Sequence, residues 1–204
     1  MKRVVLVAIL LAFAAASTLA AGPAASATPE LQLDGSSAPL APTRTCRSRG
    51  EGQHPFRARD FATEGDLRVG PVSFKALRLA ARRAYRTDRI NRLKAPPVVR
   101  AGRTVTVAIA AADRGDVGLD FLPNVEVERP EDGQSAIRFE ACPSDEPAFS
   151  HDGTVGYATA FPGAFVVRGT RCFTLEIWID GREEPRRVTV KVGSDATRRC
   201  PAPR

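Results

Sequence analysis

The sequence predicts an all-β fold, a single two-layer antiparallel β-sandwich held by two disulfides. Three observations support this prediction: strand-like alternation of apolar and polar residues, several short segments of this kind separated by Gly and Pro, and four cysteines among 204 residues. Helical periodicity is weak almost everywhere. We therefore expect one domain in which the apolar faces of two sheets meet.

The clearest strand pattern lies within residues 165–192. Every second residue of Phe173–Ile179 is apolar, and Asp180-Gly181 then supplies a turn signal before alternation resumes over 188–192. This pattern predicts an antiparallel hairpin. Its apolar face needs a second sheet to cover it, because an isolated hairpin is only marginally stable in water.

Residues 1–27 have the features of a secretory signal peptide. A positively charged start precedes an apolar run, and Ala25-Ser26-Ala27 is a small-residue cleavage site. An uncleaved membrane anchor is the alternative, since the apolar run approaches the length of a membrane span. The Pro-, Ser- and Thr-rich residues 28–45 predict a flexible linker, so the sandwich domain would span 46–204.

The charge of the chain is moderately basic. The whole sequence has a net charge of +7, and removing the signal peptide takes away Lys2 and Arg3, which leaves 28 basic and 23 acidic residues, a net of +5. An exported basic chain suits an anionic surface outside the cell. We expect a secreted or envelope-associated protein with no transmembrane segment after cleavage, whose partner is an anionic envelope polymer or another envelope protein and not nucleic acid.

All four cysteines lie beyond the signal peptide, and an even number in an exported chain predicts two disulfides. Three pairings are possible. Alternation places Cys142 and Cys172 on the outward faces of their strands, and cysteines on neighbouring strands can bridge, so we favour Cys142 with Cys172. Cys46 and Cys200 would then pair by elimination and tie the ends of the domain together.

Further strands are predicted upstream of the hairpin. The segment 67–79 fits a strand interrupted at Gly70-Pro71, and a turn before residue 104 leads into a strand over 104–109. A kinked start followed by such a strand is common in immunoglobulin-like sandwiches. After a loop over 113–120, two more strands are expected at 121–127 and 135–141.

The segment 77–92 is ambiguous between helix and strand. Its basic residues recur at three and four positions, as on one side of a helix, but its apolar residues also fit strand spacing. We favour a strand as far as Leu79, followed by a basic loop with room for a short helix.

Several of these motifs together resemble a group of uncharacterised, signal-bearing secreted proteins of high-GC Gram-positive bacteria. The motifs are VGPVSF, VVRAGRTVTV, FEACP, GAFVVRGTRCFTLEIWIDG and the final Cys200, and they span most of the chain from Cys46 onward. The resemblance implies the two-disulfide sandwich and brings no activity with it. Those proteins favour two glycines where this chain has Gly163-Ala164.

The first candidate for binding is the basic run of residues 75–103, whose only acidic residue is Asp88. Such a run could hold phosphate-rich envelope polymers or anionic lipid headgroups, with one aromatic ring for stacking. We favour the simpler interpretation, a solvated loop in an arginine-rich chain, because runs of charge are usually solvated faces. The candidate contact residues are Arg78, Arg82, Tyr85 and Arg86.

The second candidate is Trp178. By alternation its ring lies on the strand face opposite the core, where an exposed indole could serve as a platform for a sugar ring or a partner protein. We favour instead that another segment covers it, most simply residues 46–61 with Phe56 and Phe61, because large apolar rings are seldom left bare.

The sequence contains no recognisable catalytic motif. Ser150-His151-Asp152 has the residue types of a catalytic triad, but neighbours along a loop cannot align nucleophile, base and orienting group. His54 and His151 are the only histidines, and three aspartates within 113–120 match no calcium-loop spacing. We expect a non-catalytic binding or structural module without a cofactor. An extracellular hydrolase with an unrecognised site is the alternative.

Overall fold

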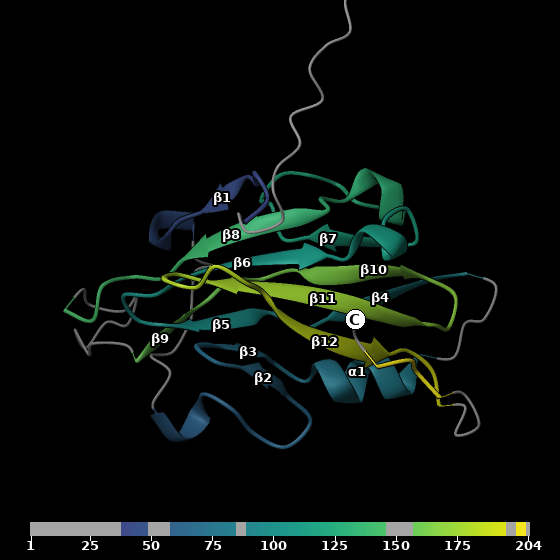
Figure 1. Ribbon diagram of the computed structural model, residues 1–204, viewed down its shortest axis with the longest axis horizontal. Helices are drawn as coiled ribbons and strands as arrows, with labels where there is room; N and C mark the ends of the chain where they lie inside the picture. The colour runs from purple at the N-terminus through teal and green to yellow at the C-terminus, as the bar shows by residue number, and fades with distance from the viewer. Residues whose placement is uncertain (1–37, 49–57, 85–88, 146–156, 195–198, 203–204) are drawn as a thin grey trace, which may run out of the picture. The chain divides into compact units, whose positions relative to one another are not determined.

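The computed structural model of the chain describes residues 38–48, 58–84, 89–145, 157–194 and 199–202 (Figure 1). These ranges contain twelve strands in three sheets, four short 3-10 helices and one α-helix. Several predictions fall outside the described residues: the signal peptide 1–27, most of the linker, His54, Tyr85, Arg86 and the segment 150–152.

The largest sheet contains the predicted central hairpin. Its strands, in spatial order, are β1 (Thr43–Arg44), β8 (Ala136–Glu140), β6 (Thr104–Ile109), β11 (Cys172–Ile179) and β12 (Arg186–Lys191). Neighbours run antiparallel, except that β1 is parallel to β8. The predicted apolar face is confirmed, because Phe173, Leu175 and Ile177 are almost completely buried.

The two smaller sheets form one bent layer, because two of their strand pairs continue from one sheet into the other in the same register. One contains β2 (Leu67–Val69), β3 (Val72–Phe74), β5 (Pro97–Arg100) and β9 (Ala158–Ala160); the other contains β4 (Ile90–Lys94), β10 (Ala164–Arg168) and β7 (Val117–Asp120). β4 leads into β5 and β9 into β10, and both pairs keep one register, with Ala160 facing Val98 and Ala164 facing Lys94. The break falls at Pro96 and Pro162, because proline has no N–H for the ladder.

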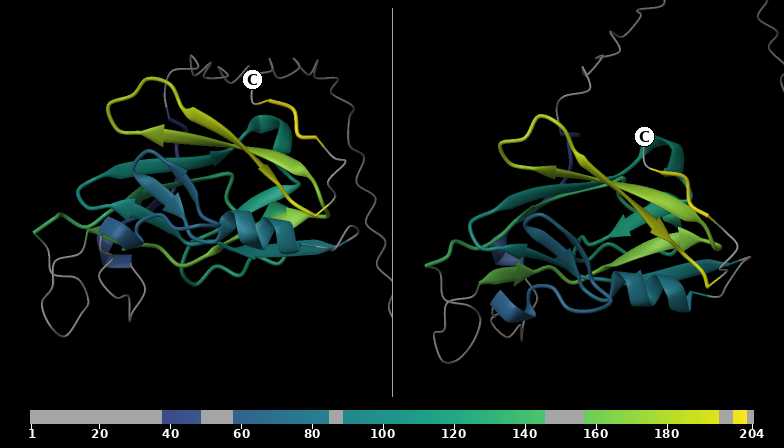
Figure 2. Two further views of the ribbon diagram at one scale, coloured as in Figure 1. Left: turned by 90° about the horizontal axis from the view of Figure 1, so that it is seen from below. Right: turned by 60° about the horizontal axis from the view of Figure 1, so that its bottom comes forward.

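The core lies between this bent layer and the five-stranded sheet (Figure 2). The ring of Phe165 on β10 lies 6.1 Å from that of Phe173 on β11, 5.7 Å from that of Phe74 on β3 and 5.3 Å from that of Phe121. Aromatic contacts therefore join all three sheets. The predicted β-sandwich with two disulfides is confirmed, and its immunoglobulin-like character stays a prediction.

A helix replaces part of the strand predicted to reach Leu79. β3 ends at Phe74, and α1 spans Leu77–Arg83. Leu77 and Ala81, four residues apart, are buried against the core, whereas Leu79 is exposed. The helical interpretation is correct for 77–83, because a strand would place Leu79 on the same face as Leu77 and Ala81, whereas a helix turns it away from them.

A buried carboxylate holds the turn between β3 and α1. Ala76 adopts a left-handed φ of 54°, which directs the chain out of the sheet. The carboxylate of Asp66 accepts a hydrogen bond from the Ala76 N–H (2.6 Å) and pairs with the Lys75 ammonium (2.5 Å). Local backbone and side-chain donors thus compensate for the burial of this charge.

The strand predicted at 121–127 is wrong, and β7 occurs earlier, within the segment expected to be a loop. Val117 and Leu119 alternate into the core while β7 pairs with β10. The chain then leaves the sheet near Pro123 and the left-handed Asn124, whose φ is 62°. Pairing with β10 thus decides which apolar residues form the strand.

The predicted disulfide pairing is also wrong. The disulfides join Cys46 to Cys142 and Cys172 to Cys200. Cys142 and Cys172 are not on neighbouring strands, since β6 lies between β8 and β11. Because these strands are antiparallel, Cys142 follows the end of β8 beside the start of β6, whereas Cys172 begins β11 beyond the other end of β6.

The folded domain includes residues that the sequence assigned to the linker 28–45. In β1, Arg44 faces Phe139 of β8, which brings the following cysteine to the end of β8. Arg44 is buried, and its guanidinium donates hydrogen bonds to the carbonyl oxygens of Phe121 (2.6 Å) and Pro162 (2.8 Å). Burial lowers the pKa of this guanidinium. Residues 43 and 44 therefore belong to the sandwich and not to the predicted linker, because Arg44 fastens them to it.

Candidate anion-binding groove

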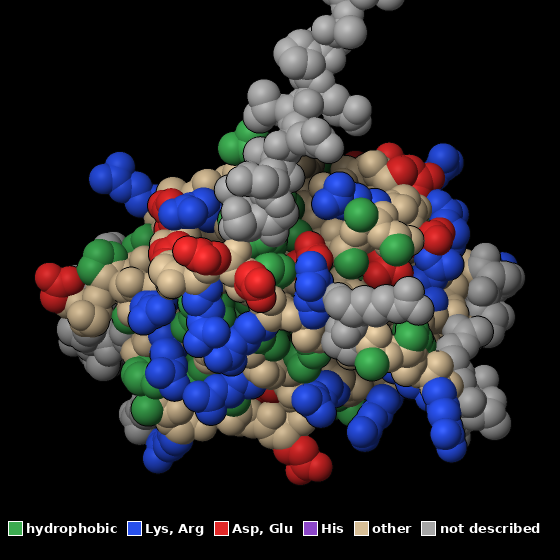
Figure 3. Space-filling view, viewed as in Figure 1, with side chains coloured by type: hydrophobic (Ala, Val, Ile, Leu, Met, Phe, Trp, Pro, Cys, Tyr) green, Lys and Arg blue, Asp and Glu red, His purple; other side chains and the backbone are tan. Residues whose placement is uncertain are grey.

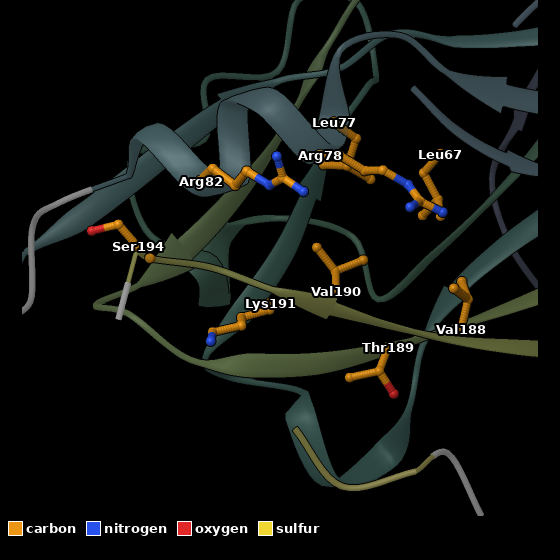
Figure 4. Close-up of a pocket in the computed structure, with 10 residues that line it drawn as sticks. Leu67, Leu77, Arg78, Arg82, Val188, Thr189, Val190, Lys191 and Ser194 are labelled. Carbon is orange, nitrogen blue, oxygen red and sulfur yellow. The ribbon is translucent and has the colours of Figure 1, made fainter. Parts of the chain in front are cut away.

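An open groove of about 530 Å³ lies between α1 and β12 (Figure 4). Its apolar lining comes from β2, α1 and β12, and its cations come from α1 and β12. The volume lies within the range of small-ligand sites. The lining residues are Leu67, Leu77, Arg78, Arg82, Val188, Thr189, Val190, Lys191, Gly193 and Ser194.

The helical period of α1 positions the two arginines. Arg78 and Arg82 are four residues apart, so they share a helix face beside the buried stripe. Figure 4 shows both side chains reaching from α1 into the space faced by Val188 and Val190. The N–H of Gly193 donates a hydrogen bond to the carbonyl oxygen of Ala81 (2.8 Å), which joins the chain after β12 to the helix.

The groove carries positive charge that the described residues do not neutralise. Arg78, Arg82 and Lys191 make no ion pair and no side-chain hydrogen bond within the described part of the chain. No acidic residue is among the described residues that line the groove. Arg78 and Arg82 lie on the side of β12 that Val188 and Val190 face, and Lys191 adds a third cation from the other side of that strand (Figure 4).

A second groove, of about 540 Å³, lies on the other side of α1, against β4. Its cations include Arg83 and Lys94, for which the described residues likewise supply no acidic partner, and Arg92, which is paired with Asp120. In Figure 3, Lys and Arg side chains are spread over the lower half of the face, with the densest group at the lower left and separate ones around α1. Unpaired cations thus flank α1 on both sides.

The predicted basic run does not form one continuous surface. Arg78 and Arg82 come together at the groove, but Lys75 is paired with Asp66 at the base of α1. Arg100, on β5, stacks over the ring of Phe61 at 5.2 Å. The run is therefore divided among several elements, and only part of it is free to contact a partner.

Sequence reasoning did not connect Lys191, Val188 and Val190 with the groove. All three belong to β12, which lies more than a hundred residues after α1 in the chain. Alternation identifies Lys191 as a polar residue of a strand, but no local signal shows that this strand runs beside α1. Only the tertiary contact between the two elements assembles the groove.

Trp178 does not offer an exposed ring. It faces Thr106 of β6 on the outer face of the five-stranded sheet and is only 8 % exposed. Burial agrees with the favoured interpretation, but Phe61 does not provide the cover, because it packs with Val98 and Ala158 on the other layer. Among the described residues, no hydrogen-bond acceptor meets the Trp178 indole N–H.

The three aspartates of the segment 113–120 have separate partners. Asp113 accepts a hydrogen bond from the Thr174 N–H (2.8 Å), and Asp120 is paired with an arginine of β4. Asp116 is paired with Arg171 and Arg168, and the hydrogen bond from Arg171 lowers the pKa of its carboxyl. Within the described ranges, no three His, Cys, Asp or Glu residues are grouped so that they could hold a metal ion.

Comparisons of the chain with protein-family models, with curated proteins and with solved structures found no match. The resemblance to secreted proteins of high-GC Gram-positive bacteria therefore stays a prediction. In the described part of the chain, no helix has the length and apolar character needed to cross a membrane.

Proposed function

We propose that the protein is a secreted or envelope-associated, non-catalytic binding module that holds an anionic partner in the groove between α1 and β12. The observation that carries the proposal is a set of three groove cations, Arg78, Arg82 and Lys191, that make no ion pair within the described residues. The two disulfides support an oxidising compartment, in keeping with the signal peptide that the sequence predicts.

The two kinds of cation would act differently on such a partner. A guanidinium presents planar, paired donors that match a carboxylate or a phosphate, so Arg78 and Arg82 would orient the anion. The Lys191 ammonium would act as a point charge on the β12 side. All three lie at an open surface, so their attraction for the partner should weaken as salt screens it.

The test measures binding of fluorescently labelled polyphosphate to the whole protein at rising salt. The double variant Arg78→Glu, Arg82→Glu should weaken binding about tenfold or more, because it replaces two attractive charges by two repulsive ones. The matched control, Arg103→Glu with Arg182→Glu, changes net charge equally at exposed positions outside the groove. It should change affinity by less than about threefold.

Two outcomes would contradict the proposal. If both double variants weakened binding equally, net charge and not the groove would be responsible. If the groove variant bound as tightly as the unchanged protein, in low and in high salt, the groove would have no role in anion binding.

A further inference from the structure

Among the described strands β12 is an edge strand that pairs only with β11, and the groove runs along its open side. An edge strand presents a row of backbone donors and acceptors that another strand can use. Which groups of β12 are free follows from the hydrogen bonds of its neighbours.

The backbone of Thr189 points away from β11. Thr189 faces Thr174 of β11, and Thr174 uses its own backbone groups on the other side: its N–H donates to Asp113 (2.8 Å) and its carbonyl accepts from Ala110 (3.0 Å). The Thr174–Thr189 pair is therefore a non-hydrogen-bonded pair of the antiparallel ladder, which directs the N–H and C=O of Thr189 outward.

The neighbouring residues follow the same alternation. The N–H of Val192 donates to the carbonyl of Arg171 (2.7 Å), toward β11, so the backbone of Lys191 points outward like that of Thr189. Arg187, two residues before Thr189, has the same orientation. Outside the β11 ladder, the described residues supply no backbone partner for these three positions.

We infer that an extended acidic segment of a partner protein pairs with β12 as an added strand and occupies the groove. The inference rests on the proposed function and names its partner. The free backbone groups of β12 would supply the pairing, as in other proteins that bind peptides by strand addition. Apolar side chains on alternate positions would face Val188 and Val190, beside the stems of Arg78 and Arg82. The acidic side chains between them would point to the opposite face of β12, toward Lys191.

The charge of β12 argues against a second copy of this chain as the occupant. Two β12 strands paired edge to edge would bring Arg186, Arg187 and Lys191 of one copy against those of the other. Like charges directly opposite on paired strands are destabilising. The same cations that discourage self-pairing favour an acidic strand.

The experiment uses the whole protein and three labelled peptides. The parent peptide is acetyl-Glu-Val-Glu-Val-Glu-Val-Glu-amide, and its two derivatives are N-methylated either at every Val or at every inner Glu. Charge and side chains are the same in all three. Only one set of N–H groups in an extended peptide can face β12, so each derivative is the matched control for the other.

One derivative should bind about tenfold or more weakly than the parent, and the other within about threefold of it. Equal binding of all three peptides, or equal loss for both derivatives, would overturn strand addition. The proposed anion-binding function would survive this result if the double variant Arg78→Glu, Arg82→Glu still bound the parent peptide more weakly than the unchanged protein does. Only strand addition would then be ruled out. Binding of polyphosphate but of no peptide would assign the groove to a polymer and also overturn the inference.

Discussion

Among single residues, Gly163, the first residue of the GAFVVRGTRCFTLEIWIDG motif, has no room for a side chain. It lies between β9 and β10 with a φ of 156°, which side chains rarely adopt. A Cβ atom there would lie 2.2 Å from Cδ1 of Phe121 and 2.4 Å from the carbonyl oxygen of Asp120. The second position of this pair, where the similar proteins favour glycine, tolerates alanine. Ala164 is an ordinary buried residue of β10.

We predict that Gly163→Ala lowers the free energy of unfolding by about 3 kcal/mol, because the backbone of Asp120 cannot easily move away. Gly181→Ala is the control: its φ is 77°, but nothing lies within 4 Å of the added atom. That change should cost only about 1 kcal/mol. Urea unfolding of both variants measures the difference, and equal losses would show that close packing at Gly163 is unimportant.

Asp66 makes the stability of the domain depend on pH. Burial raises the pKa of its carboxyl, but hydrogen bonds from Ala76, Lys75 and Thr63 together outweigh burial and hold the pKa below its ordinary value. A carboxyl whose pKa is lower in the folded protein stabilises the fold above its unfolded pKa of about 3.9. This stabilisation disappears as the pH falls through the folded value.

Asp66→Asn should therefore destabilise the protein by about 3 kcal/mol at pH 7, since it removes the ion pair between Asp66 and Lys75. The difference from the unchanged protein should shrink below about pH 4, where the aspartate itself becomes protonated. Thermal unfolding from pH 7 to pH 2 measures both effects. Glu183→Gln, an exposed carboxylate on the β11–β12 turn, should show neither effect. A pH-independent difference would rule out the carboxylate charge as the cause.

Among the elements, the strands with the most regular alternation were predictable, but apart from the β11–β12 hairpin their partners were not. The hairpin β11–β12 and the strands β6 and β8 follow from residues close in sequence. α1 and β7 were misassigned, because their few apolar residues fit more than one secondary structure. Which residues are buried in the fold decides between helix, strand and loop. The same lack of long-range information led to the wrong cysteine pairs.

The two disulfides close separate loops, so each can be removed independently. The Cys46–Cys142 bond spans 96 residues and the Cys172–Cys200 bond spans 28. Loop entropy favours the longer one, with contributions of about 4.7 and about 3.6 kcal/mol. Replacing the first pair by alanine should thus be more destabilising by about 1 kcal/mol.

Chemical unfolding of the two double variants checks this difference, and peptide mapping without reduction checks the pairing itself. We expect linked peptides that contain Cys46 with Cys142 and Cys172 with Cys200. Recovery of a Cys142–Cys172 peptide would contradict the order of strands in the five-stranded sheet.

Across the whole described molecule, the basic character of the chain is distributed unevenly. Ion pairs occupy Lys75, Arg92, Arg168 and Arg187 on different elements. The unpaired cations that flank α1 are brought together by a helix and two strands that belong to different sheets. Composition predicted an anionic partner, but it could not locate the surface.

The sequence by itself determined the β class, the central hairpin and the presence of two disulfides, because alternation and cysteine count are local or additive properties. It also singled out Arg78 and Arg82, two of the three cations of the groove. Only the tertiary structure decided the disulfide partners, the extent of α1 and the place of Lys191 beside it. These depend on which strands become neighbours, and that is settled by the burial of apolar faces from distant parts of the chain.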